Sequence, residues 1–312
     1  MGQTPSNTNN NSEDYLKEYI ENTDYKDNKE VSVNKPNKDN EKDLGSIDDM
    51  NYHSIDISEL PCKRFYPAGT IIKIRAAEVK EIQAFSTVDD KNIYDIYEKS
   101  NAMLSRCVRV KLPNGQMRPW TYIIDNDRWY LLFAIKEFTF QKSQDLTVTV
   151  DDIKIPIRRE NFEFHDVEEK LEKFWDKHNG CFVFPTKFGK EFRLAPPTLG
   201  LQKSITDFMV EEMRNKNEKP LSESFLKIFP YTFIGQTSIT PEGIKKHIYE
   251  FENKLDKDEF SFLNKAVDKL KFGIKGVKKQ VGGMEVRSDS IFPTGISGLF
   301  VSHDAFDDFI EW

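Results

Sequence analysis

The stretch IIDNDRWYLLFAIKEFTF, residues 123–140, is the most apolar part of an otherwise polar chain. Within it, every residue from Trp129 to Ile135 is apolar or aromatic. A membrane-spanning helix needs about 20 apolar residues, so this run is too short to cross a bilayer. It is also too apolar for a helix at the protein surface. We therefore predict a helix inside the protein core, with the cluster Asp125-Asn126-Asp127 capping its start.

The 312 residues are rich in charge, with 31% charged and 38% hydrophobic side chains. Most of the net charge of −7 lies in residues 1–50, which hold 6 Lys and 12 Asp or Glu. This segment is rich in Asn and has too few apolar residues to offset the entropy cost of ordering. Residues 1–50 are therefore predicted to be a disordered, acidic, Asn-rich arm. Because basic residues do not outnumber acidic ones, the composition of the chain does not favour nucleic-acid binding.

The cysteine spacing and the N-terminal residues bear on the compartment and on targeting of the protein. Cys62, Cys107 and Cys181 lie far apart, which favours a reducing compartment over a disulfide framework. The N-terminus lacks the apolar segment of a signal peptide. It does match the N-myristoylation pattern, with Gly2 after Met1 and Ser6 at the last fixed position. So short a pattern also arises by chance, and no polybasic stretch follows, so myristoylation of Gly2 is left open.

Apolar periodicity predicts helices that alternate with short strands. Helices are expected over 76–85 and from Ile93 to Cys107, where apolar residues recur at helical spacing. Cys107 is interpreted as a small core residue rather than a nucleophile. Residues 145–165 and 180–198 alternate like short strands, and the long Val/Ile runs of parallel sheets are missing. The predicted class is α+β, a compact helix-rich domain over residues 51–239 with a small β-sheet insert.

Residues 240–312 differ from the preceding domain in their sequence pattern and composition. Thr240 followed by Pro241 is typical of a helix start, and a second apolar helical pattern ends at Leu270. The two patterns predict a helical hairpin. Residues 271–290 are rich in Gly and Lys and are predicted to be mobile, and the chain ends in an acidic, aromatic tail.

A search for chemistry finds no enzyme motif. The chain contains no P-loop, no H-E-x-x-H and no G-x-S-x-G. Its five histidines are scattered without the spacing of metal ligands. No catalytic, cofactor-binding or metal-binding residue is predicted, and the chain is not expected to be an enzyme.

Two stretches nevertheless follow a familiar order. The first is ISELPCKRFYPAGTIIKIRAAEVKEI, and the second runs from RCVRV through the apolar helix to FRLAPPTLG. The matching positions are Leu60-Pro61, Tyr66-Pro67, Ile74-Arg75, Cys107-Val108, Asp127-Arg128, Leu131-Leu132, Ile135-Lys136, Thr139 and Pro197-Thr198-Leu199-Gly200. This order resembles the baseplate hub protein family of contractile-tailed bacteriophages, which includes hub assembly factors. The resemblance covers about residues 55–215.

The resemblance implies a structural or assembly role in a virion tail baseplate. The implied location is the virion, and the host cytoplasm during assembly. Its implied partners are other tail and baseplate proteins, with the chain present in several copies and with no membrane. Some relatives carry Cys pairs in the β-insert that indicate zinc, but residues 140–165 contain no Cys, so no metal is expected. Two alternatives stay open, a nucleic-acid-binding adaptor that uses the Lys-rich segment 269–279, and an enzyme without a recognisable motif.

Aromatic residues near both ends are the predicted partner contacts, because such side chains are favoured in interface cores. Those in the tail have a second interpretation, in which they fold back onto the chain's own helical hairpin. The predicted contact residues are Tyr15, Leu16, Tyr19, Ile20, Phe306, Phe309 and Trp312.

Overall fold

The structure is a computed structural model that describes residues 51–140, 146–185, 190–215 and 223–300. Helices and several small antiparallel sheets follow one another along the chain, so the predicted α+β class is confirmed. The predicted arm (residues 1–50) and tail (residues 301–312) lie outside the described residues.

The apolar stretch forms helix α4 (Arg128–Thr139), which lies at the centre of the main core. Leu131, Leu132 and Phe133 expose none of their surface to solvent, so the prediction of a central buried helix is confirmed. The residues that bury α4 come from both halves of the chain. They lie in β1 (His53–Asp56), β2 (Ile71–Ile74), α2 (Val79–Ser86), α3 (Ile93–Cys107), β3 (Val108–Lys111), β6 (Ile153–Pro156), β7 (Phe162–Phe164), β11 (Ile274–Val281) and η8 (Ser297–Phe300).

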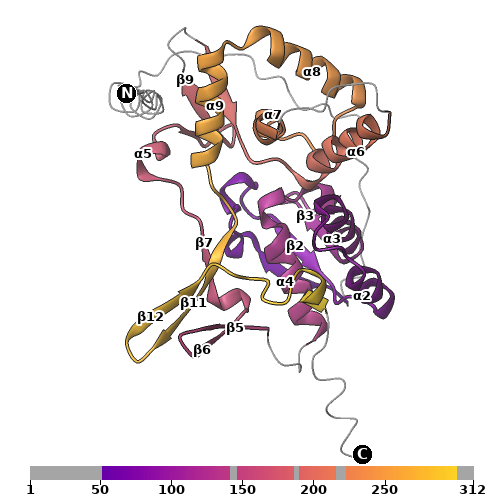
Figure 1. Cartoon of the computed structure of the whole chain (residues 1–312), viewed down its shortest axis with the longest axis vertical. Coiled ribbons are helices and arrows are strands. Elements are labelled where there is room, and N and C mark those ends of the chain that lie inside the picture. Colours follow the sequence, from indigo (N-terminus) through magenta and orange to yellow (C-terminus); the bar gives the residue numbers. More distant parts are fainter. Residues whose placement is uncertain (1–50, 141–145, 186–189, 216–222, 301–312) are drawn as a thin grey trace, which may run out of the picture.

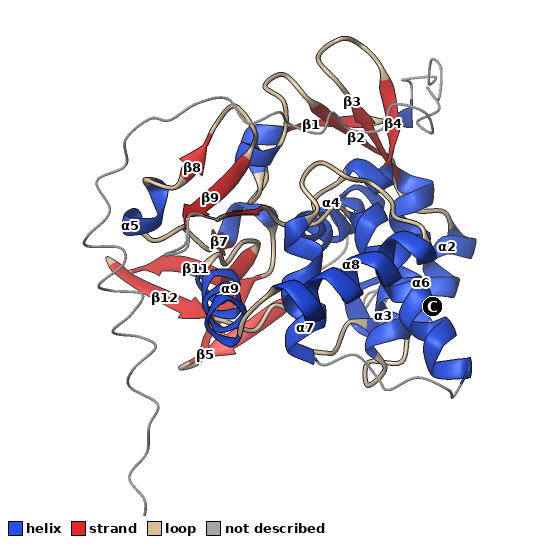
Figure 2. Cartoon of the chain, turned by 90° about the horizontal axis from the view of Figure 1, so that it is seen from above, coloured by secondary structure: helices blue, strands red, loops and turns tan. Residues whose placement is uncertain are grey.

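The first sheet has the strand order β1-β2-β3-β4 and is antiparallel throughout, with β4 spanning Met117–Pro119. Residues that pair across β2 and β3 point to the same face, and the pairs Ile72–Val110 and Ile74–Val108 are buried. Figure 2 shows this sheet along one edge of the molecule, with the helices gathered beside it. The sheet therefore contributes one apolar face to the core around α4.

A group of helices follows the middle of the chain. It consists of α6 (Leu199–Asn215), α7 (Glu223–Ile228), α8 (Pro241–Lys254) and α9 (Lys257–Lys269). Thr198 and Thr240 cap α6 and α8 through their side-chain oxygens, as their sequence positions predict. Figures 1 and 2 both place α6 next to α3.

The remaining strands form three small antiparallel sheets. β5 (Thr147–Val150) pairs with β6 in the predicted β-insert. The short helix α5 (Glu169–Glu172) leads to the sheet β10-β9-β8, made of Glu191–Leu194, Cys181–Pro185 and Trp175–Asp176. The third sheet, β12-β11-β7, joins a strand of the predicted insert to strands near the end of the described chain.

The prediction that residues 271–290 are mobile is wrong. They form a β-hairpin of β11 and β12 (Met284–Ser288), and β11 also pairs with β7. The glycines serve this geometry: Gly282 and Gly283 have the positive φ angles of a tight turn, and a Cβ on Gly276 would lie 2.3 Å from the carbonyl oxygen of Ser288. Val277 is fully buried, so the hairpin is part of the core.

Both helices of the predicted hairpin are present, and each also packs against other helices. α8 buries Ile244 against α6, whereas α9 buries Leu263 in a cluster with α7 and β9. Phe251 of α8 packs against both clusters, so the two helices share part of their apolar surroundings. Since Val277 and Phe300 belong to the core around α4, residues 240–300 share the core of the preceding residues.

Candidate functional site

The start of α4 is held by the carboxyl group of Asp127, which exposes none of its surface to solvent. Its Oδ1 atom accepts a hydrogen bond from the backbone N–H of Cys62 (2.9 Å), and its Oδ2 atom accepts one from the hydroxyl of Tyr66 (2.7 Å). The same hydroxyl accepts a hydrogen bond from the backbone N–H of Ile124 (2.9 Å). We call these four residues the Asp127 anchor. It ties the segment around η3 (Lys63–Phe65) to the entry of α4.

The prediction that Asp125 and Asp127 cap α4 is wrong. Asp127 directly precedes the helix, but its side chain makes no capping hydrogen bond. Its carboxyl meets two donors from a distant part of the chain, and buried donors need acceptors. Asp125 instead accepts hydrogen bonds from the side chain of Arg128.

The ionisation of the Asp127 anchor is dominated by burial. Burial raises the pKa of Asp127 to about 7, although the hydrogen bonds from Tyr66 and Cys62 act in the opposite direction. Burial, with the charge of Asp127, also raises the pKa of Tyr66 and of the Cys62 thiol well above their ordinary values. A carboxyl group with a pKa near neutrality can transfer protons, but a substrate would have to reach it. Asp127 is enclosed on all sides, so the arrangement is suited to holding two segments together.

Arg128, the first residue of α4, links this helix to α3. It is 2% exposed, and its guanidinium donates to Oδ1 of Asp125 through Nε (3.1 Å) and Nη2 (2.6 Å). Its Nη1 atom donates to Oδ1 of Asn101 on α3 (2.7 Å). The guanidinium also lies over the ring of Tyr97, 4.7 Å from the centroid. Arg128 therefore fixes the positions of two side chains on α3.

The segment Pro197-Thr198-Leu199-Gly200 links α6 to the same region. The carbonyl oxygen of Pro197 accepts from the backbone N–H of Asp125 (2.8 Å), and the backbone N–H of Leu199 donates to the carbonyl of Ile123 (2.7 Å). A Cβ on Gly200 would lie 2.6 Å from Cβ of Thr121 and 2.1 Å from the carbonyl oxygen of Thr237. Only glycine lets the first turn of α6 approach η4 (Trp120–Tyr122) this closely.

These contacts build a groove between α3 and α6, with a volume of about 820 Å³. Arg128 positions Tyr97 and Asn101 in the α3 wall, and Gly200 allows the α6 wall to approach Trp120. The groove combines aromatic, small and acidic side chains. Its lining residues are Tyr94, Tyr97, Glu98, Asn101, Ala102, Ser105, Trp120, Lys203, Thr206, Asp207, Val210 and Glu211. We call this site the α3–α6 groove.

The sequence alone gave little sign of this groove. Tyr97 follows the apolar spacing of the helix from Ile93 to Cys107, which favours a core position, and Trp120 closes a segment with the pattern of a loop. The walls come from α3 and α6, which are far apart in the sequence. The sequence signal for this region is the pair of motifs Asp127-Arg128 and Pro197 to Gly200, two of the positions on which the resemblance described above rests.

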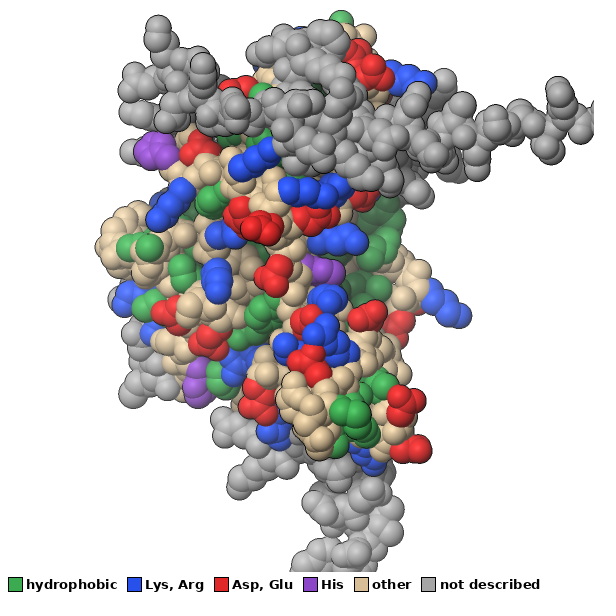
Figure 3. Space-filling view, turned by 90° about the vertical axis from the view of Figure 1, so that its left-hand side faces the viewer, with side chains coloured by type: hydrophobic (Ala, Val, Ile, Leu, Met, Phe, Trp, Pro, Cys, Tyr) green, Lys and Arg blue, Asp and Glu red, His purple; other side chains and the backbone are tan. Residues whose placement is uncertain are grey.

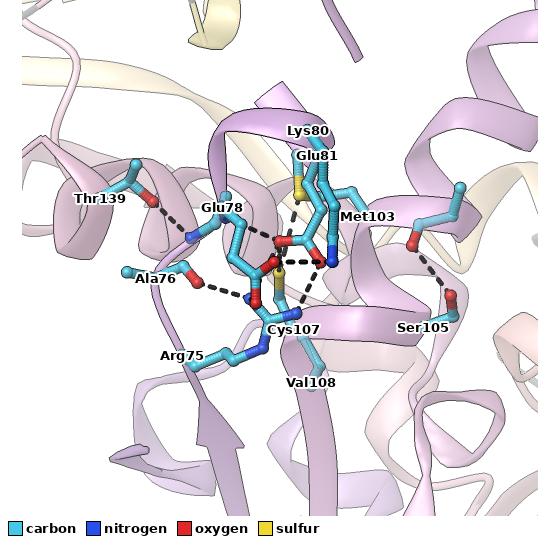
Figure 4. Close-up of polar contacts among 12 residues, drawn as sticks. Arg75, Ala76, Glu78, Lys80, Glu81, Met103, Ser105, Cys107, Val108 and Thr139 are labelled. Carbon is cyan, nitrogen blue, oxygen red and sulfur yellow. Dashed lines mark hydrogen bonds and ion pairs between the residues drawn. The ribbon is translucent and has the colours of Figure 1, made fainter. Parts of the chain in front are cut away.

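A second polar cluster lies where α2, β2 and the end of α3 meet (Figure 4). The guanidinium of Arg75 donates to both carboxylate oxygens of Glu81 (2.9 and 2.6 Å), and Glu81 is only 3% exposed. Burial would raise the pKa of Glu81, but hydrogen bonds from Arg75 and from the Glu78 N–H lower it to about 2. Burial raises the pKa of Cys107 to about 12, so its thiol stays protonated in the core.

A more basic pocket of about 630 Å³ opens beside this cluster. Four cationic side chains and one carboxylate line it, together with Tyr52 and Ser105. The charged residues are Arg75, Lys80, Arg106, Arg109 and Glu81. Arg75 is paired with Glu81 and Lys80 with Glu78, and Arg109 donates to the carbonyls of Ser105 and Val108. Three of the four cationic side chains of this pocket therefore already have partners within the protein.

The predicted partner-binding residues at the two ends are not placed by the structure. They lie outside the described residues: Tyr15, Leu16, Tyr19, Ile20, Phe306, Phe309 and Trp312. The two alternatives for the tail, contact with a partner or with the chain's own helices, therefore stay predictions.

The Lys-rich segment 269–279 does not form a continuous basic surface. Lys275 pairs with Glu163 (2.9 Å), and Lys278 pairs with Glu285 (3.6 Å). Lys279 donates to the carbonyl oxygen of Lys154 (3.1 Å). On the face that carries the β11–β12 hairpin, acidic and basic side chains are interspersed (Figure 3). Such a surface lacks the one-sided positive charge expected for binding a phosphate backbone.

Within the part of the chain that the structure describes, no group of three or more His, Cys, Asp or Glu side chains could hold a metal ion. None of the described helices combines the length and the apolar composition that crossing a membrane requires. No family model, curated protein or solved structure matches the chain.

Proposed function

We propose that the chain is a structural or assembly protein of a contractile-tailed bacteriophage baseplate, in its hub region, and that it acts through protein–protein contacts. The proposal combines the resemblance of its motifs with the place those motifs take in the fold. Its partners are other tail and baseplate proteins. It works in the virion tail and, before that, in the host cytoplasm during assembly.

One observation carries the proposal. The motifs Asp127-Arg128 and Pro197-Thr198-Leu199-Gly200 lie far apart in the sequence, yet they meet and position the two walls of the α3–α6 groove. The matching residues thus serve to build a preformed surface feature with aromatic side chains. Aromatic residues of this kind are enriched at the centres of protein interfaces.

The two alternatives receive less support. The lysines that would contact a nucleic acid include Lys275 and Lys278, which are paired with acidic neighbours on the same sheet. Asp127 has the raised pKa of a proton-transfer group, but it is enclosed and its hydrogen bonds connect two segments of the core. Protein contact remains the function that the geometry supports best.

Mass spectrometry of purified particles tests the proposal. In cells infected with a phage that encodes the chain, intact virions and isolated baseplate intermediates are purified and digested. We expect peptides of the chain in at least one of the two, at a level comparable with known tail proteins, with an abundant host cytosolic protein as the contamination control. Presence in both indicates a virion component, and presence only in intermediates indicates an assembly factor. Absence from both contradicts the proposal.

A further inference from the structure

The α3–α6 groove has a distinctive chemistry, because acidic and aromatic side chains line it together. Its acidic residues are Glu98, Asp207 and Glu211, and its one lysine, Lys203, is already paired with Asp207. Glu98 and Glu211 are exposed and form no ion pair with the residues that the structure describes. The groove therefore carries negative charge at its rim.

Three aromatic side chains, Tyr94, Tyr97 and Trp120, line the groove together with these acids, and Tyr97 is held in place by a buried neighbour. The buried guanidinium of Arg128 lies over the ring of Tyr97, and Arg128 is itself held by Asp125 and Asn101. Trp120 belongs to η4, which the glycine at position 200 allows to lie directly against α6. Because these walls are fixed before a ligand arrives, little entropy is lost in ordering them on binding.

The combination of acidic and aromatic side chains favours a ligand with positively charged side chains. A guanidinium or ammonium group is attracted by the faces of Tyr and Trp rings and by carboxylates at the rim. Its aliphatic stem fits against the apolar side chains of Ala102 and Val210. An acidic peptide or a phosphate backbone would meet the repulsion of Glu98 and Glu211.

We propose that the α3–α6 groove docks a segment of a partner protein that presents arginine or lysine side chains. The identification of that partner as another tail protein rests on the proposed function, but the charge and the aromatic lining of the groove do not. Arginine fits best, because its planar group can stack on a ring while it donates two hydrogen bonds to a carboxylate.

Two matched peptides test this chemistry on the full-length chain. One is a short helical peptide that carries several arginines among leucine and alanine, and the other has uncharged citrulline at the same positions. Binding is followed by titration calorimetry and by the NMR resonance of the Trp120 indole N–H, assigned with Trp120→Phe. We expect the arginine peptide to bind roughly tenfold more tightly than the citrulline peptide at low salt, to shift the Trp120 resonance, and to lose its advantage as salt increases.

Exposed side chains provide the variants, so that folding is preserved. The double change Glu98→Gln and Glu211→Gln should reduce the affinity for the arginine peptide to that for the citrulline peptide, whereas Glu252→Gln, an exposed acid on α8, should leave it unchanged. Equal binding of the two peptides, binding without a shift at Trp120, or binding of neither peptide at millimolar concentration would each overturn the inference. If the chain is found in tails but its groove shows no preference for arginine, only this inference fails. If the groove prefers arginine but the chain is absent from tails and intermediates, only the proposed function fails.

Discussion

Hydrogen bonds to distant parts of the chain hold helix α4 at both ends, and a buried carboxyl group lies at or near each end. At its start, Asp127 accepts hydrogen bonds from Cys62 and Tyr66 and has no cation within the anchor. Near its end, Thr139 accepts from the backbone N–H of Ala77, close to the pair of Arg75 and Glu81 (Figure 4).

Both carboxyl groups are almost inaccessible to solvent, but Asp127 lies deeper in the protein, and the two ionise in opposite ways. Burial raises the pKa of Asp127 to about 7, whereas the hydrogen bonds from Arg75 and from the Glu78 N–H overcome the burial of Glu81 and lower its pKa to about 2. The neutral donors thus do not compensate for the deep burial of Asp127, whereas the bidentate guanidinium of Arg75 compensates for the shallower burial of Glu81. The two ends of α4 should therefore respond differently to mutation and to pH.

The largest effect is expected between the two ends, in the middle of α4. Phe133 is fully buried, and its ring packs against those of Phe162 and Phe292. Phe133→Ala should lower the free energy of unfolding by about 3–5 kcal/mol, because it leaves a cavity that the core cannot fill. Chemical denaturation measures this, with Val79→Ala as the control, since Val79 is 69% exposed. If Phe133→Ala changed the free energy of unfolding as little as Val79→Ala does, α4 would be peripheral.

The next effect should come from the ion pair of Arg75 and Glu81, which lies near the end of α4. Arg75→Met leaves the carboxylate of Glu81 buried without its cation and should cost about 3 kcal/mol near pH 7. The pKa of Glu81 is lowered, so its pairing stabilises the protein above the ordinary pKa of 4.5, and this stability is lost as the pH falls towards 2. The deficit of the variant should therefore shrink on acidification.

A matched control for this pair lies at the surface. Arg64 also makes a bidentate pair, with Glu172, but both side chains are more than 30% exposed. Arg64→Met should cost within about 1 kcal/mol, because solvent screens an exposed pair. Equal losses in Arg64→Met and Arg75→Met would show that the burial of Glu81 does not govern the strength of its pairing.

The start of α4 should show the opposite pH dependence. Because the pKa of Asp127 is raised from 3.8 to about 7, the folded protein holds a proton that the unfolded chain releases. Its contribution to stability is complete below about pH 4 and is lost as the pH rises towards 7, by up to about 1.4 kcal/mol per pH unit. Asp127→Asn should cost about 1–3 kcal/mol at pH 5, because an amide nitrogen cannot accept a hydrogen bond, whereas the hydroxyl oxygen of the protonated acid can, and this cost should shrink towards pH 7.

Denaturation of wild type and Asp127→Asn at several pH values tests this sign. The lowered pKa values of His165 and His247 add stability with rising pH, but both proteins share them, so they cancel in the difference. A difference that is constant between pH 4 and pH 7 would show that Asp127 stays ionised in the folded state.

Local features of this fold could be predicted from the sequence, and long-range ones could not. The helix from Ile93 to Cys107 and the cap at Thr240 follow from spacing and residue type within a few turns. The role of Asp127 depends on Cys62 and Tyr66, which are 65 and 61 residues away, so a local interpretation assigned it to capping. Gly282 and Gly283 resembled a flexible segment because a tight turn and a mobile loop use the same residue.

The smallest effect should come from the hydroxyl of Thr139 at the end of α4. Thr139→Val keeps the shape of the side chain but removes the acceptor for the Ala77 N–H (2.9 Å) and the donor to the Ile135 carbonyl (2.6 Å). Because Ala77 is only partly buried, water can replace part of this contact, and we expect a loss of about 1 kcal/mol. Thr87→Val at the exposed end of α2 should change the stability by less than about 0.5 kcal/mol. Neither hydroxyl titrates, so the loss at Thr139 should be the same from pH 4 to pH 8. A loss that varies with pH would mean that Thr139 acts through the nearby pair of Arg75 and Glu81, and that the two features form a single anchor at this end of the helix.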